Sequence, residues 1–209
     1  MLPEKKRCGD VSKVLDYNMR ELVFATNNQH KTQEVRNLLL NEYSILNLND
    51  IGCTTDIQET GNTFAENATL KSRYVADHYH MDCFADDSGL EIEALNQEPG
   101  IFSARYSGNR DDRENLMLVL KKMEGQTNRR ARFRTVISLI RGGENFLFEG
   151  IINGLIRTEP TGIQGFGYDP VFEPEGYDQT FAEMSMEQKN QISHRALAMK
   201  KLIAFLKER

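Results

Sequence analysis

Two adjacent aspartates, Asp86 and Asp87, stand in the segment ADDSGLEI between two apolar stretches. We expect strands over residues 82–86 and 90–94 with a turn between them, so that both carboxylates lie where a buried strand ends. In open α/β sheets, ligands gather at the carboxyl ends of strands, and carboxylates there can hold Mg²⁺ or act as bases. Neighbouring strand residues point to opposite faces, so one aspartate should face the ligand. The alternative is an Asx-turn completed by the following Ser-Gly.

A second candidate site is the segment TNNQHK, residues 26–31, between a predicted strand and a predicted helix. A helix N-terminus presents unpaired backbone N–H groups and the positive end of the helix dipole, which favour phosphate. Thr26, Asn27 and Asn28 add side-chain donors, and Lys31 adds a cation. The alternative is an asparagine-rich turn that only caps the helix.

The segment 56–73 offers a further carboxylate and a further cation. Glu59 precedes a glycine turn, and Thr63-x-x-Glu66 predicts a capping box at the start of a helix over residues 63–80. Lys71 follows about two helical turns after the cap. Glu59 could bind a metal and Lys71 a phosphate, whereas the alternative is a solvated helix face.

The C-terminal third contains two further candidate segments. In GFGYDPVF, the glycines permit close backbone approach, Phe166 or Tyr168 offers a ring for stacking on a base, and Asp169 offers an acceptor. The alternative is a structural turn with buried aromatic rings. Lys189, His194 and Arg195 lie in a helix predicted to run from residue 185 to about 207. Together the three could read a carbonyl or a phosphate.

The remaining periodicity places these segments on an α/β fold with a mixed sheet. Short apolar runs predict strands, and apolar residues at helical spacing predict helices. Gly142-Gly143 predicts a hairpin turn between two long strands. The expected strands are 21–26, 44–48, 131–140 and 144–157, and the other expected helices are 31–43 and 110–124.

Composition limits the class of protein. The 209 residues fit one domain, which we place at 19–209, after a polar N-terminal extension, 1–18, that we expect to be disordered and dispensable for activity. A net charge of −5 argues against nucleic acid as a partner. No apolar run approaches the ~20 residues needed to span a membrane. Three widely spaced cysteines predict reduced thiols in a cytoplasmic protein.

Taken together, ADDSGLEI, PGIFSARYSG, GFGYDPVF and KNQISHRALA resemble the inosine triphosphate pyrophosphatase family, over nearly the whole chain from Met19 onward. The resemblance implies an elongated α/β fold with two lobes around a central nucleotide-binding cleft, usually as a homodimer. It also implies Mg²⁺-dependent hydrolysis of ITP, dITP and XTP to the monophosphate and pyrophosphate.

The resemblance also assigns roles to individual positions. Asp87 would be the catalytic carboxylate and a metal ligand. Many members have two acidic residues where this chain has Gln58-Glu59, so either Glu59 becomes the second metal ligand or water fills that place. The expected substrate-binding residues are Thr26, Asn27, Asn28, Gln29, His30, Lys31, Lys71, Ser88, Phe166, Gly167, Tyr168, Asp169, Lys189, His194 and Arg195.

Three rival functions remain open at this point. A related septum-inhibitor-like family acts on dTTP, UTP or modified pyrimidines, although GFGYDPVF and SHRALA argue against that assignment. A nucleotide-binding protein without catalysis would bind ITP but not turn it over. A phosphatase would release inorganic phosphate stepwise, so the products of the reaction separate it from a pyrophosphatase.

Overall fold

The computed structural model describes residues 20–39 and 43–208, so the expectations for residues 1–18 lie outside the described part. One mixed sheet of six strands organises the chain, in the order β2-β1-β3-β4-β5-β6. Its strands are β1 Arg20–Phe24, β2 Tyr43–Asn47, β3 Cys83–Ile92, β4 Arg130–Arg141, β5 Glu144–Ile156 and β6 Phe172–Pro174. The helices are α1 Gln29–Leu38, α2 Phe64–Tyr79, α3 Asp112–Lys122, α4 Met186–Ile192 and α5 His194–Lys207, with short 3₁₀ turns η1 Glu93–Leu95, η2 Gly100–Arg105 and η3 Asp169–Val171.

Strand β3 is continuous through the two aspartates, so the predicted turn at DDSG is wrong. All ten of its residues, from Cys83 to Ile92, pair with β4 in antiparallel register. Pairing with a long neighbouring strand overrides the local turn preference of Asp, Ser and Gly. The alternative of an Asx-turn therefore fails as well, and the aspartates lie in the middle of a strand.

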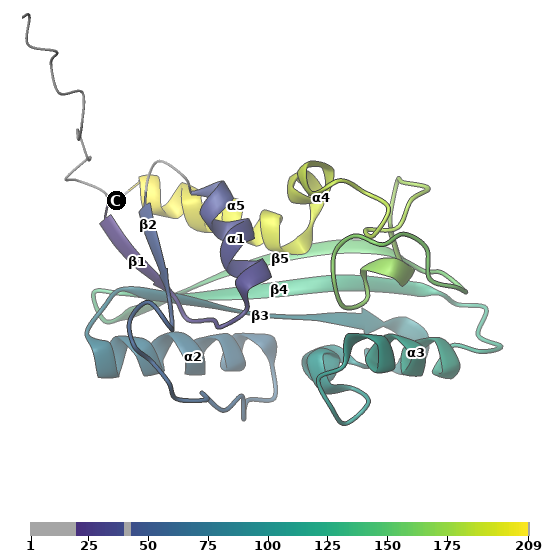
Figure 1. Ribbon diagram of the computed structural model, residues 1–209, viewed down its shortest axis with the longest axis horizontal. Helices are drawn as coiled ribbons and strands as arrows, with labels where there is room; N and C mark the ends of the chain where they lie inside the picture. Colours follow the sequence, from purple (N-terminus) through teal and green to yellow (C-terminus); the bar gives the residue numbers. More distant parts are fainter. Residues whose placement is uncertain (1–19, 40–42, 209) are drawn as a thin grey trace, which may run out of the picture.

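The long hairpin of β4 and β5 forms as predicted. Its turn residues, Gly142 and Gly143, have φ angles of 58° and 84°. Positive φ at both central positions gives the twist that matches a two-residue hairpin loop, and glycine adopts it without steric cost. The twelve paired positions of β4 and β5 carry the sheet along the whole molecule (Figure 1).

At one end of the sheet, helices cover both faces (Figure 1). Helices α1 and α5 pack on one face around Phe24, Phe84 and Leu202. Helix α2 packs on the other face, where Val75 meets Ala85. Because alternate residues of β3 point to opposite faces, Asp86 lies on the α1–α5 side and Asp87 on the α2 side.

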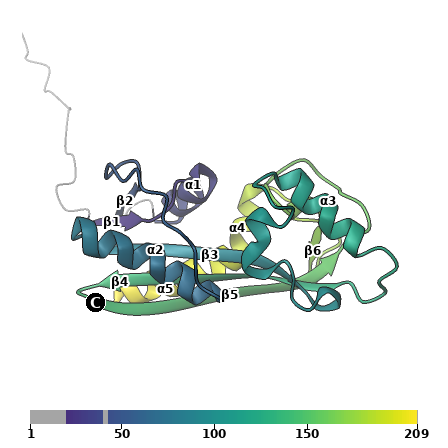
Figure 2. The same cartoon turned by 90° about the horizontal axis from the view of Figure 1, so that it is seen from below.

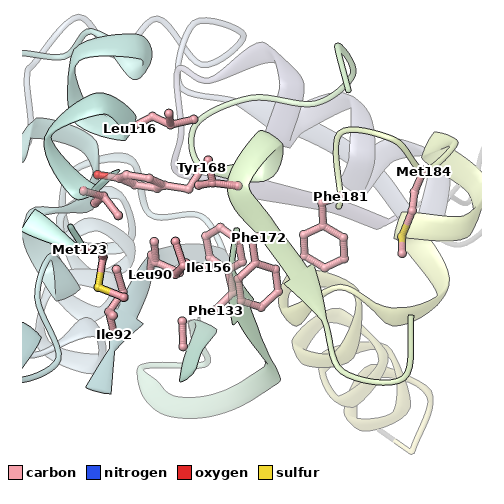
Figure 3. Close-up of a cluster of buried hydrophobic side chains, with 13 residues drawn as sticks. Leu90, Ile92, Leu116, Met123, Phe133, Ile156, Tyr168, Phe172, Phe181 and Met184 are labelled. Atoms are coloured by element: carbon pink, nitrogen blue, oxygen red, sulfur yellow. The ribbon is translucent and has the colours of Figure 1, made fainter. Parts of the chain in front are cut away.

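The other end of the sheet has its own core beneath α3 and the loops that lead to β6. Figure 3 shows Tyr168, Phe172 and Phe181 gathered with Phe133 of β4 and Leu116 of α3. Two packed ends joined by the long strands β3, β4 and β5 give the elongated, two-lobed α/β fold that was predicted, as both views show (Figure 2).

The C-terminal helix predicted over residues 185–207 is two helices. Ser185 begins α4 at the predicted start, with a capping box in which its hydroxyl and the Gln188 side chain each accept a hydrogen bond from the other residue's backbone N–H. Ser193 then adopts an extended conformation, with φ −63° and ψ 152°, and its hydroxyl accepts a hydrogen bond from the Ala196 N–H to begin α5. The break turns the next two residues, His194 and Arg195, into the protein interior.

Smaller differences concern helix starts. Helix α1 begins at Gln29, earlier than predicted, because the Asn28 side chain accepts a hydrogen bond from the Lys31 N–H. The capping box at Thr63 is half made: the hydroxyl accepts from the Glu66 N–H, but the Glu66 carboxylate accepts from Asn62.

Within the described residues, no helix combines the length and the apolar character that a membrane crossing requires. Cys53 and Cys83 are both buried free thiols, and Cys8 lies outside the described part.

Candidate active site

A cavity of about 410 Å³ opens where β1 stops and β3 continues. Strand β1 pairs with β3 only at Val23–Cys83 and Phe24–Phe84. Beyond these pairs, the edge of β3 no longer has β1 beside it, and Asp87, Ser88 and Gly89 line the cavity. Contrary to the prediction, strand β3 does not end at the aspartates, and the strand that ends beside them is β1.

Fifteen of the predicted site residues line this one cavity, although they come from five separate segments. Asp86 is not among the lining residues. Gln29 is exposed at the start of α1 and does not line the cavity, and the side chain of His30 lies outside the described part. The predicted residues that line it are Thr26, Asn27, Asn28, Lys31, Glu59, Lys71, Asp87, Ser88, Phe166, Gly167, Tyr168, Asp169, Lys189, His194 and Arg195.

Asp86 is a buried anchor for two cations. Its Oδ1 lies 2.9 Å from Lys31 Nζ, and its Oδ2 lies 3.2 Å from Arg195 Nε. Burial alone would raise the pKa of the Asp86 carboxyl, but the two cations outweigh burial and hold the pKa well below its usual range. Asp86 is therefore ionised, and it holds helices α1 and α5 together at the cavity wall.

Asp87 points to the opposite side of the strand, and no described residue forms an ion pair with it like those of Asp86. Its Oδ2 accepts a hydrogen bond of 3.1 Å from Asn67 Nδ2, and its Oδ1 accepts one from the Ser88 N–H. Burial raises the pKa of the Asp87 carboxyl, and the nearby Lys71 cation offsets only part of the rise. Of the two aspartates, Asp87 is the stronger base and the one with access to the cavity.

Lys71 reaches across from α2 to the loop before it. Its Nζ forms a short ion pair with Glu59, whose other carboxylate oxygen lies 3.4 Å from Arg105. Burial favours a higher pKa for Glu59, but Lys71 reverses the effect and the pKa is lowered. Glu59 is ionised and faces two cations, while the adjacent Gln58 is exposed and bonds to Asp56.

At the far end of the cavity, the loop of residues 165–169 lies over the ammonium group of Lys189. Lys189 Nζ lies 2.7 Å from Asp169 Oδ2 and 4.9 Å from the centre of the Phe166 ring. The same carboxylate oxygen accepts the Phe166 N–H, so Asp169 fixes both the loop and the lysine. Tyr168 turns away into the core, where its hydroxyl donates to the Ser103 carbonyl oxygen. Phe166 is the ring of this loop that faces the cations.

His194 and Arg195, which follow the break at Ser193, are buried. The His194 ring stacks on Phe133 at 4.7 Å between ring centres. Burial, together with the charges of Arg195 and Lys189, lowers the pKa of His194 well below its ordinary value, so the imidazole is neutral. Its Nδ1 is buried and has no hydrogen-bond partner within the described residues.

Several residues around the cavity were missed by sequence reasoning. Glu34 bonds Arg195 at 2.7 Å, Asn67 bonds Asp87, and Asp112 accepts the Gly167 N–H at 2.9 Å. Arg110 and Asn115 also line the cavity. Helical spacing places Glu34 three residues after Lys31, on the same face of α1, and this was the one signal that could have found it.

A divalent cation is compatible with this chemistry, although the described residues do not form a preformed cage. Among them, no group of three or more His, Cys, Asp and Glu side chains comes together. Mg²⁺ commonly takes one or two carboxylates and completes its shell with water and substrate phosphates. Asp87, a cavity-facing carboxylate that forms no ion pair within the described residues, fits that pattern. Glu59 fits less well because its carboxylate already pairs with Lys71 and Arg105.

Comparison with known proteins gives the family. The Ham1 family profile matches residues 22–205 of the chain. The chain belongs to the Ham1 family. A relative from Flavobacterium psychrophilum, named dITP/XTP pyrophosphatase, is 51% identical over 188 residues, which cover 90% of this chain and 99% of the relative. A Bacillus licheniformis relative with the same name is 45% identical and covers 90% and 98%.

Solved structures of Ham1 proteins share the fold. The Staphylococcus aureus Ham1 protein has a TM-score of 0.84 at 43% identity, over 90% of this chain and 99% of that one. A HAM1 protein from Coxiella burnetii has a TM-score of 0.86 at 39% identity, over 91% and 100%. The family resemblance read from the motifs and the predicted fold class are both confirmed.

Proposed function

We propose that this Ham1-family protein is a nucleoside-triphosphate pyrophosphatase that hydrolyses ITP, dITP and XTP to the monophosphate and pyrophosphate. By removing these non-standard purine nucleotides, it would cleanse the nucleotide pool. One observation carries the proposal: Lys31, Lys71, Lys189 and Arg195 line a single cavity around the carboxylate of Asp87. In a chain of net charge −5, this concentration of cations fits a small, highly charged anion. The names of the curated relatives support the substrate class.

The phosphates would lie at the end of the cavity formed by α1 and α2. Lys31 and Lys71 supply positive charge there, and the start of α1 supplies backbone N–H groups. Burial lowers the pKa of the Lys31 ammonium, against the raising effect of Asp86, while Lys71 has a raised pKa because Asp87 and Glu59 outweigh its burial.

In the proposed reaction, a water oxygen forms a bond to the α-phosphorus and the bond from that phosphorus to the α–β bridging oxygen breaks. Pyrophosphate leaves with the bridging oxygen, and the proton of the water needs an acceptor. Asp87 would orient or deprotonate this water, and its raised pKa makes it a better base than an ordinary aspartate. A Mg²⁺ ion bound by Asp87, with Glu59 as second candidate, would supply charge neutralisation on the phosphates.

The base would lie between the Phe166 loop and the start of α5. Arg195 and Lys189 are donors, and the neutral His194 can donate through one ring nitrogen. Donors suit the 6-oxo group of hypoxanthine and xanthine, whereas the 6-amino group of adenine would leave them unpaired. A site of this kind can discriminate by about 10⁴-fold.

Assembly and location complete the proposal. A homodimer rests on the resemblance to the family. A cytoplasmic location rests on the buried free thiols of Cys53 and Cys83, which are typical of a reducing compartment.

A substrate panel tests the proposed function. We would measure kcat/KM for ITP, dITP, XTP, ATP and dTTP in the presence of Mg²⁺. The proposal predicts turnover of the first three at least about 100-fold above ATP and dTTP. Preference for dTTP would favour the pyrimidine-specific relatives, and tight binding of ITP without turnover would favour a binding protein. Either result would refute the proposed function.

A further inference from the structure

Asn115 of α3 has a buried side-chain amide whose oxygen is hydrogen-bonded and whose NH₂ group, within the described residues, is not. The residue is 1% exposed and lines the cavity. Its Oδ1 accepts a hydrogen bond of 2.7 Å from the Ser107 N–H. Because a backbone N–H can only donate, this bond fixes the orientation of the amide. The remaining group, Nδ2, has no hydrogen-bond partner in the described part of the chain.

The position of Asn115 assigns it to the base end of the cavity. Asp112, three residues earlier and on the same face of α3, holds the Gly167 N–H at 2.9 Å. Asn115 is therefore beside the loop that carries Phe166. Helices α1 and α2, which carry the proposed phosphate ligands Lys31 and Lys71, lie toward the other end of the sheet (Figure 1).

A buried donor without a partner is uncommon in natural structures, and a ligand or an ordered water usually satisfies it. The proposed substrates differ from one another, and from GTP, at a single place on the base. The 2-position of the purine carries hydrogen in ITP, a carbonyl oxygen in XTP and an amino group in GTP. All three share the 6-oxo group, so recognition of that group cannot separate GTP from the proposed substrates.

We propose that Asn115 reads the 2-position of the purine through Nδ2. The amide N–H donates to the 2-oxo group of xanthine and leaves room for the 2-hydrogen of hypoxanthine. Against guanine it meets a second donor, so that both groups lose their hydrogen bonds on burial. This inference rests on the proposed function and adds to it the residue that excludes GTP. Asn115 is a specificity-determining residue in this account, separate from the phosphate and metal chemistry.

Two substitutions test the assignment. Asn115→Asp keeps an oxygen for the Ser107 N–H and replaces the Nδ2 donor by an acceptor of the same size. Asn115→Leu removes the donor without adding an acceptor. We would measure kcat/KM for XTP, ITP and GTP at pH 8, where the new carboxyl group is most ionised. The ratio of XTP to GTP should fall at least tenfold in Asn115→Asp and by a smaller factor in Asn115→Leu, while ITP changes least.

The outcomes separate specificity from structure. If all three nucleotides lose activity by the same factor and the XTP-to-GTP ratio stays within twofold of wild type, Asn115 only supports the loop and the inference is overturned. Thermal unfolding of both variants shows whether α3 has been disturbed. Calorimetric Kd values for XTP and GTP without metal give the same ratio independently of turnover. A wild type that prefers XTP in binding but hydrolyses nothing would refute the proposed function alone.

Discussion

The two adjacent aspartates should respond oppositely to the same substitution. Asp86→Asn and Asp87→Asn each remove one negative charge and keep the shape of the side chain. Asp86 is 2% exposed and lies within 3.2 Å of both Lys31 Nζ and Arg195 Nε. Among the described residues, its neighbour Asp87 forms no ion pair and accepts hydrogen bonds from Asn67 and from the Ser88 N–H. The first substitution removes a counter-charge that Lys31 and the buried Arg195 share, and the second relieves a buried charge.

The magnitude follows from the buried pairs. Removing one partner of a buried ion pair costs about 3–5 kcal/mol. Arg195 keeps its bond of 2.7 Å to Glu34, so we place Asp86→Asn near the lower limit, at about 3 kcal/mol. For a chain of this size, that loss lowers the Tm by roughly 6–12 °C. Asp87→Asn should change the Tm by no more than about 2 °C, since an amide can retain one hydrogen bond.

Activity should show the reverse contrast. Loss of a general base typically lowers turnover by about 10²–10⁴-fold, so Asp87→Asn should lose ITP hydrolysis while remaining folded. Differential scanning fluorimetry and a pyrophosphate-release assay on both variants give the four numbers needed. The reasoning is refuted if Asp87→Asn retains near wild-type turnover, or if Asp86→Asn melts with the wild type.

Three further predictions follow from the fold and the site. A Cβ at Gly150 would lie 2.0 Å from the His194 carbonyl oxygen. Gly150→Ala should therefore displace α5 and lower the free energy of unfolding, measured in urea, by about 1–3 kcal/mol. Asn153→Ala, at an exposed position of the same strand, is the control, and equal urea midpoints for the two variants would contradict this prediction. The pKa of His194 is lowered in the folded protein, so the unfolded state binds the extra proton and wild-type stability should fall as pH drops below about 6.5. The stability of His194→Gln should fall less over the same pH range. Parallel stability profiles of the two proteins would count against a buried neutral imidazole. EDTA should abolish ITP turnover, and added Mg²⁺ should restore it. The Tm without nucleotide should stay the same, because the described residues form no cluster of three or more acidic, His or Cys side chains. Turnover that survives chelation would exclude a metal requirement.

Local signals in the sequence predicted much of the fold. Ser185 at the start of α4 and Gly142-Gly143 in the hairpin carry their structural reasons in their own chemistry. The turn predicted at DDSG failed because turn preference is local, whereas the strand is imposed by pairing with β4. The break at Ser193 was also invisible, since a serine within an apolar helical pattern is ordinary.

The candidate site was predictable as a set of chemical types but not as a set of contacts. Lys31, Asp87 and Arg195 stand out because their segments match a family. That Asp86 holds Lys31 and Arg195, or that Glu34 bonds Arg195 from 161 residues away, depends on how α1, β3 and α5 meet. Tertiary proximity of this kind has no signal in a single sequence.

The identity of the products tests the proposed reaction most directly. The protein would be incubated with Mg²⁺ and ITP, and nucleotides, pyrophosphate and inorganic phosphate would be separated and quantified. Cleavage of the α–β linkage predicts IMP and pyrophosphate in equal amounts from the earliest times, without IDP. The appearance of IDP with inorganic phosphate would contradict the account, because it would place the attack at the terminal phosphate.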